Sequence, residues 1–162
     1  MKMRWIPVAA LLGLLVAACG SDAGPSEVTF DVELIEIKGS TDGIAPPEVD
    51  PASLSLGYRY KQPGAVDPEN ANKWEVSTYI FAPGSMSVVQ GDTVTLRMFG
   101  VNGDVHDVYV VAPDGTVAVE ALTVNRGREY IVTFEASQTG HYKLLCTTHA
   151  PTMQADILSL GG

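Results

Sequence analysis

Apolar and polar residues alternate with a period of two along most of the second half of the chain. In DTVTLRMFG, residues 92–100, Val94, Leu96 and Met98 fall on one face and polar side chains fall on the other. Successive side chains of an extended strand point to opposite faces, so this pattern predicts a strand with one buried face. The same reading predicts strands at 28–38, 74–83, 85–89, 92–100, 105–111, 117–122, 128–136, 141–146 and 153–160.

Turn-forming pairs such as Pro83-Gly84, Asn102-Gly103 and Pro113-Asp114 separate these segments, and no segment has a convincing helical period. Many short, half-buried strands predict an all-β fold, an antiparallel Greek-key β-sandwich. The chain has 162 residues, enough for one ordinary domain, which we expect to cover 28–162. Residues 39–72 are rich in Gly, Pro, Asp and Asn and predict an elaborated loop region, with one further strand near 54–60.

The first residues have the pattern of a targeting segment. Lys2 and Arg4 precede an apolar run at 8–16, which is too short for an ordinary membrane-spanning helix. The ending Val16-Ala17-Ala18-Cys19 resembles the lipobox of bacterial lipoproteins. This resemblance implies a signal peptide at 1–18, a lipid on the sulfur of Cys19, and a short tether at 19–27.

The chain is acidic. Its formal charge is -9, and removal of Lys2 and Arg4 with residues 1–18, which contain no acid, changes it to -9 - 2 = -11. This charge argues against binding to nucleic acid and leaves room for docking on a basic protein. The acidic residues are interpreted mainly as a solvated surface; they include Glu27, Glu33, Asp50, Asp67 and Glu69.

The chain has two cysteines, and a lipid on Cys19 leaves Cys146 without a disulfide partner. A lone thiol in an oxidising compartment is a liability unless something occupies it, and a metal is one such occupant. In the segment CTTHAPTM, strand parity points Cys146 and Met153 inward, with His149 in the loop between them. His106, at the entry of another strand, also faces inward.

Two histidines, one cysteine and one methionine are therefore expected at one end of the sandwich. A thiolate and two imidazoles form a trigonal set that suits copper, and a thioether adds a weak axial ligand. Taken singly, each residue also has an ordinary structural explanation, such as a buried thiol or core-filling methionine. The shared spacing, strand context and parity favour a metal site.

The chain at this point resembles the cupredoxins, or blue copper proteins. The resemblance rests on Cys146-x2-His149-x3-Met153, on the upstream His106, and on the flanking segments VVQGDTVTL and FEASQTGHYKLLC. It covers about half of the chain, from roughly 74 to 160. It implies that one copper ion, cycling between Cu(I) and Cu(II), is held by His106, Cys146 and His149 as strong ligands and by Met153 as the axial ligand.

Two other copper families share features with the chain. The approach at 102–106 is similar to the copper A domain of cytochrome oxidase subunit II and nitrous-oxide reductase, but that domain needs two cysteines in its ligand loop, and this loop has only Cys146. Nitrosocyanin replaces the axial methionine with a carboxylate, and Met153 argues against it, although Asp104 or Asp107 is close in sequence. A mononuclear site is favoured.

Neighbours of the ligands are expected to tune the site. Asp107 stands where cupredoxins often have Asn, and we predict that it accepts a backbone N–H near Thr147 and lowers the reduction potential. Thr147 is predicted to bond near the thiolate. His141 shares the opposite face with Lys143 and is expected to be exposed. Buried packing is the favoured interpretation for the aromatic residues near 58–60, Trp74 and Tyr79, with a surface beside the site as the alternative.

The leading functional prediction is a one-electron carrier and not an enzyme. It is expected to be an exported monomer, tethered by lipid at the periplasmic or extracytoplasmic face of the cell envelope. Its partners would be redox proteins such as cytochromes or oxidase and reductase complexes, reached through His149 and the small apolar rim of Ala150 and Pro151. The alternatives are a copper-binding or copper-delivery lipoprotein and, less favoured, an enzyme with a nucleophilic thiol or an open copper site.

Overall fold

A computed structural model describes residues 24–41, 58–61, 74–103 and 105–162. The predicted signal peptide, Cys19, the first part of the tether and most of the 39–72 region lie outside the described residues. Every regular element in the described residues is a strand. None of the described residues forms a helix long and apolar enough to cross a membrane.

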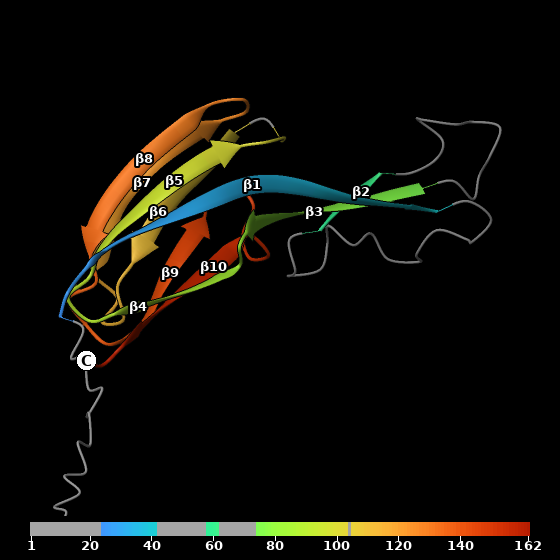
Figure 1. Cartoon of the computed structure of the whole chain (residues 1–162). Helices are drawn as coiled ribbons and strands as arrows, with labels where there is room; N and C mark the ends of the chain where they lie inside the picture. Colours follow the sequence, from blue (N-terminus) through green and yellow to red (C-terminus); the bar gives the residue numbers. More distant parts are fainter. Residues whose placement is uncertain (1–23, 42–57, 62–73, 104) are drawn as a thin grey trace, which may run out of the picture.

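The strands form two five-stranded sheets that face each other (Figure 1). The first sheet has the order β2-β3-β1-β5-β8, formed by β1 (Glu27–Thr41), β2 (Arg59–Lys61), β3 (Trp74–Ala82), β5 (Thr93–Gly100) and β8 (Glu129–Glu135). The second has the order β4-β10-β9-β6-β7, formed by β4 (Ser85–Val89), β6 (Val105–Val111), β7 (Val117–Asn125), β9 (Gly140–Cys146) and β10 (Gln154–Leu160). The predicted all-β sandwich is confirmed.

Both sheets are mixed and not purely antiparallel. The pairs β1–β5 and β10–β4 are parallel, and the other paired strands are antiparallel. Both parallel pairs join strands that are distant in sequence, because β4 of the second sheet comes between β3 and β5 of the first. Period-two patterns report which face of a strand is buried, and they carry no information on the direction of its neighbour.

The core lies between the sheets and follows the predicted alternation. Val94, Leu96 and Met98 of β5 are fully buried, while the residues between them are more exposed. On β9, Tyr142, Leu144 and Cys146 face the same core, and on β10 Ala155 and Ile157 do. Removing these apolar side chains from water supplies the main driving force for the sandwich.

Two strand ends of the second sheet meet at one end of the sandwich. Val108 of β6 pairs with Cys146 at the end of β9, which places His106, two residues earlier on β6, beside the β9–β10 connection. The ribbon of β1 and β3 extends beyond the sandwich at this same end (Figure 1). The β9–β10 connection, residues 147–153, is therefore bordered by strands from both sheets.

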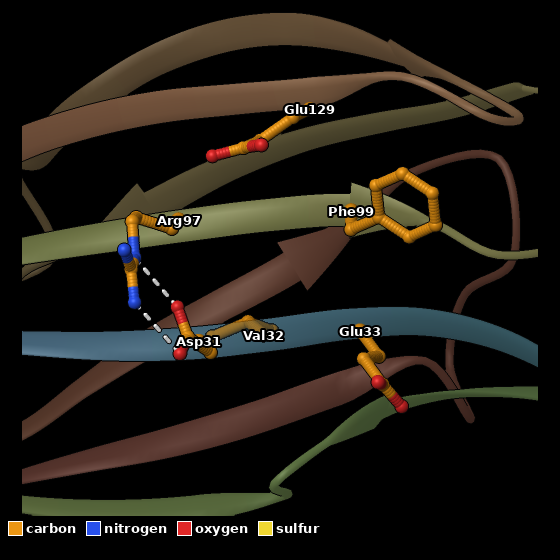
Figure 2. A pocket seen from close by; sticks show the side chains of 6 residues that line it. All are labelled: Asp31, Val32, Glu33, Arg97, Phe99 and Glu129. Atoms are coloured by element: carbon orange, nitrogen blue, oxygen red, sulfur yellow. Dashed lines mark hydrogen bonds and ion pairs between the residues drawn. The ribbon is translucent and has the colours of Figure 1, made fainter.

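The outer face of the first sheet carries charged and apolar side chains side by side (Figure 2). The Arg97 guanidinium donates to both carboxylate oxygens of Asp31, with Nε to Oδ1 at 2.6 Å and Nη2 to Oδ2 at 2.8 Å. Phe99 pairs across the strands with Glu33 on one side and Glu129 on the other. His141, on the second sheet, is also exposed as predicted, and it contacts Asp156.

Candidate metal centre

His106, Cys146 and His149 converge in the interior of the protein. One ligand atom from each of the three lies within 4.8 Å of the others. His106 is 0% exposed, Cys146 is 1% exposed and His149 is 8% exposed. A buried cluster of two imidazoles and a thiol needs hydrogen-bond partners or a metal, because buried polar groups are costly when they are left unsatisfied.

His106 has one nitrogen paired and one nitrogen free. Its Nε2 lies 3.1 Å from the backbone oxygen of Asn102, and because a carbonyl oxygen only accepts, Nε2 carries the hydrogen. Its Nδ1 is buried and has no hydrogen-bond partner among the described residues. Burial lowers the pKa of His106, which favours the neutral ring. The unpaired Nδ1 thus keeps a free lone pair in the interior of the protein.

His149 lies in the turn that follows β9. Its Nδ1 is 3.6 Å from the Sγ atom of Cys146. Burial, with smaller contributions from His106 and Arg59, lowers the pKa of His149 to about 4. The imidazole is therefore neutral at physiological pH, which is the form that binds metals.

Tyr79 of β3 covers the His149 ring. The two rings are stacked, with centroids 3.6 Å apart and planes inclined by 15°. Tyr79 also meets His106 edge-on, with centroids 5.8 Å apart. Burial raises the pKa of Tyr79, and so does the neighbouring Glu36 carboxylate, which is hydrogen-bonded to the Tyr79 hydroxyl. Tyr79 is thus a protonated phenol of the ribbon that packs against both histidines.

Cys146 ends β9 with its sulfur in the core. Burial raises the pKa of the thiol, and this effect is opposed by backbone interactions with His149, Thr148 and Asp107 and by the Thr148 side chain. The backbone amides are donors that stabilise negative charge on sulfur. The raised pKa favours the neutral thiol in the metal-free protein, and a bound metal ion would supply the positive charge that converts it to the ligating thiolate.

Met153 closes the ligand loop and is 1% exposed, so the prediction that it faces inward is confirmed. The Met153 backbone N–H donates to the His149 oxygen at 3.2 Å, and the Cys146 N–H donates to the Met153 oxygen at 3.1 Å. Cys146 and Met153 also line a surface hollow with the loop residues Ala150 and Pro151. The assignment of Met153 as an axial ligand stays a prediction.

Asp107 ties the two ligand segments together, although not through the predicted contact. The Thr147 N–H donates at 2.9 Å to the backbone oxygen of Asp107 and not to its carboxylate. The carboxylate instead accepts from the Thr123 hydroxyl at 2.6 Å and the Thr148 hydroxyl at 3.3 Å. The carboxylate turns toward these hydroxyls because β7 and the loop both place them beside it. Thr148, and not Thr147, is the threonine with its side chain near the sulfur.

Two residues of the site were not identified from sequence as site residues. Asn102 holds His106 through its backbone oxygen, and its side chain bonds the backbone of Glu36 on β1. Gly103 has a φ of +77°, and a Cβ there would lie 2.9 Å from Tyr79 Cε1 and 3.2 Å from His106 Nε2. In the sequence, Asn102 and Gly103 indicated only a turn. Tyr79 was noted, but its stacking depends on how β3 passes the ligand loop.

The donor set fits one copper ion. Neutral imidazoles and a buried thiolate satisfy the preferences of both copper oxidation states, and the unpaired His106 Nδ1 is the buried atom that such an ion would satisfy. When bound, copper supplies reversible one-electron chemistry. The protein supplies buried ligands that are already gathered within 4.8 Å of one another.

Comparisons with known proteins agree with this fold. No protein-family model matches the chain. The chain is 32% identical over 95 residues to the methylamine utilization protein MauL of Methylophilus methylotrophus, a match that covers 58% of this chain and 52% of that protein. The chain thus spans about half the length of this curated relative.

Three solved structures align with the chain, and the titles of two of them name copper. The multicopper oxidase mgLAC aligns with a TM-score of 0.51 at 17% identity, covering 84% of this chain and 39% of that one. Auracyanin A, a "blue" copper protein from Chloroflexus aurantiacus, aligns at 0.48 and 15% identity, covering 83% and 99%. A mutant of amicyanin in its reduced state aligns at 0.38 and 24% identity, covering 50% and 73%. Fold and site together define a cupredoxin-like β-sandwich with a buried His-Cys-His set.

Proposed function

We propose that this protein is a mononuclear type 1 copper protein that carries single electrons between redox partners. The observation that carries the proposal is the buried cluster itself, in which His106 Nδ1 has no partner and the His106 residue lies beside a thiol and a second neutral imidazole. In this proposal His106, Cys146 and His149 are the strong ligands, and Met153 is the axial ligand. Cys146 is the free cysteine of the described residues, which favours one copper over a binuclear centre.

The buried ligands support a carrier more than an enzyme or a delivery protein. A copper enzyme needs an open coordination position, whereas Met153 closes the fourth position in this proposal. A delivery protein needs ligands that exchange readily. The three donors here are at most 8% exposed, so exchange would require the loop to open.

We further propose that the protein acts outside the cytoplasm as a monomer, tethered through a lipid on Cys19. Its partners are other redox proteins such as cytochromes or oxidase and reductase complexes. The hollow lined by Tyr109, Ala150 and Pro151 is an apolar surface beside the ligand loop, which suits brief docking. Replacement of Cys19 by serine should move the protein from the membrane fraction to the soluble fraction, while the wild-type chain stays in the membrane.

The test of the copper centre is a titration of the purified, metal-free protein with Cu(II). We expect an intense visible charge-transfer band that saturates at one copper per chain and disappears reversibly on reduction. Cys146→Ser should lose this band because the thiolate is its donor, while Cys146→Ser must still show the wild-type far-ultraviolet circular dichroism spectrum.

Three results would contradict the proposal. The first is a colourless wild-type complex, the second is colour that survives in Cys146→Ser, and the third is saturation at two coppers. Rapid transfer of copper to a weak chelator, without reversible redox cycling, would favour the delivery function instead. Electron paramagnetic resonance spectra of the same samples distinguish a mononuclear centre from a binuclear one.

A further inference from the structure

The β1–β3 ribbon reaches the metal centre through one aromatic side chain. Tyr79 belongs to the first sheet, whereas His106, Cys146 and His149 belong to the second sheet and its β9–β10 loop. The stacking of Tyr79 on His149 at 3.6 Å is thus a contact between the two layers of the sandwich. Its geometry, with planes 15° apart, restricts rotation and tilt of the imidazole.

Tyr79 is itself held from two directions. Its hydroxyl bonds the carboxylate of Glu36, its cross-strand partner on β1. The chain at Gly103 also lies close to the ring, because a Cβ added there would be 2.9 Å from Tyr79 Cε1. The ring therefore has little freedom to leave His149.

Asn102 joins the same ribbon to the other histidine. The Glu36 N–H donates to Asn102 Oδ1 at 2.5 Å, and Asn102 Nδ2 donates to the Glu36 backbone oxygen at 3.1 Å. The backbone oxygen of Asn102 then holds His106 Nε2. Glu36 is consequently linked to His149 through Tyr79 and to His106 through Asn102. Contacts of this one ribbon residue therefore help to fix the orientation of both imidazole rings.

We infer that Tyr79 is a positioning residue of the copper centre, which holds the His149 imidazole in its ligating orientation and covers it from solvent before and after copper binds. This inference rests on the proposed function. Metal-ligating histidines usually need an outer contact that fixes the orientation of the ring, and ligand loss begins when a ring can swing away. In this protein the outer contact on His149 is a stacked ring.

The test uses two substitutions at Tyr79 and one matched control. Tyr79→Leu removes the ring, and Tyr79→Phe keeps the ring but removes the bond to Glu36. Phe134→Leu removes a different aromatic pair, Phe134 with Tyr142, whose centroids are 5.4 Å apart and which lies away from the ligands. All three are loaded with one Cu(II) and mixed with an excess of a strong chelator.

We expect Tyr79→Leu to lose copper about threefold to tenfold faster than wild type, which is the range that loss of one aromatic pair implies. Tyr79→Phe should lose copper at close to the wild-type rate because the stack is retained. Phe134→Leu should melt at a lower temperature and lose copper at the wild-type rate. The copper hyperfine splitting should change or broaden in Tyr79→Leu only.

Equal loss rates and identical spectra for wild type and Tyr79→Leu would overturn the inference, and so would an equally fast Phe134→Leu. A wild-type protein without a thiolate-to-copper band would instead refute the proposed function. Should Tyr79→Leu not fold, proton NMR of the metal-free wild type decides. The His149 ring protons must then show upfield shifts from the Tyr79 ring current, and ordinary shifts would refute the stacking role.

Discussion

A neutral His149 is the resting state of the metal-free protein at physiological pH. Burial lowers its pKa to about 4, and burial also lowers the pKa of His106. Below its ordinary pKa of 6.5 the imidazole takes up a proton in the unfolded chain but not in the folded protein. Protons therefore favour unfolding through these two rings.

The metal-free protein should lose stability as the pH falls from about 6.5 to about 4. A histidine whose pKa is lowered by folding leaves the protein fully stable when the pH is above the unfolded-state pKa. As the pH falls below that value the stability decreases, and the decrease ends near the folded-state pKa. The shift of His149 from 6.5 to about 4 corresponds to a loss of about 3 kcal/mol in the free energy of unfolding. Urea unfolding at a series of pH values measures it.

Two variants identify the source of this pH dependence. His149→Gln should show a smaller loss between pH 6.5 and 4 than the wild type. His141→Gln, which removes an exposed histidine beside Asp156, should keep the wild-type loss. A wild-type protein equally stable at pH 4.5 and 7 would contradict the expectation. Carboxylates with a lowered pKa, such as Asp92 and Asp156, reduce stability only at lower pH, below about 3.8.

At the scale of elements, one buried carboxylate joins three strands at the end of the sandwich away from the ligands. Asp92, in the turn between β4 and β5, is 3% exposed. Its Oδ1 accepts from the N–H of Ser26 at 2.7 Å and its Oδ2 accepts from the N–H of Val89 at 2.7 Å. These bonds hold the start of β1 against the β4–β5 turn, from which β1 runs to the metal centre.

Asp92→Ala should lower the melting temperature by several degrees because two backbone donors lose their acceptor in a buried turn. Asp92→Asn keeps one acceptor oxygen and should be less affected. Arg97→Met serves as the control. It removes the ion pair with Asp31 on the exposed face in Figure 2 and should change stability little, since exposed pairs contribute little. Calorimetry showing Arg97→Met as the weaker protein would contradict this ranking.

At the scale of the whole molecule, the metal centre couples both sheets. His106, Cys146 and His149 belong to the second sheet and its loop, and Tyr79 connects them to the first. A metal that binds these gathered ligands binds the folded chain more tightly than the unfolded one. Binding energy is therefore added to the stability of the whole sandwich.

Copper should raise the melting temperature until one equivalent is bound and no further. At a free copper concentration of 100 times the Kd, one site adds about 2.7 kcal/mol to the free energy of unfolding. Differential scanning calorimetry with increasing copper measures this effect, and Cys146→Ser should show a much smaller rise. A rise that continues past one equivalent would argue for additional sites.

Much of this arrangement could be predicted from sequence because it depends on strand parity. The alternation along 92–100, 141–146 and 153–160 placed Met98, Cys146 and Met153 in the interior, and all three are buried. His106 was placed on an inward face by the same rule. Parity is a local property of an extended backbone, so it needs no knowledge of neighbouring strands.

Contacts between strands could not be predicted in the same way. The parallel pairings β1–β5 and β10–β4, the Asp107 contacts with Thr123 and Thr148, and the link from Asn102 to Glu36 all join segments distant in sequence. Each depends on register and on the distance between sheets. A shift of one residue in register would turn these side chains to the opposite face.

The sequence alone thus determined the class of fold and the chemistry of the donors, since hydrophobic period and side-chain type are carried by each residue separately. The tertiary structure alone decided that His106, Cys146 and His149 gather within 4.8 Å, that His106 Nδ1 is the nitrogen left free, and that Tyr79 lies on His149. These are relations between residues of different strands. Only the packing of one sheet on the other, with its particular register, brings them together.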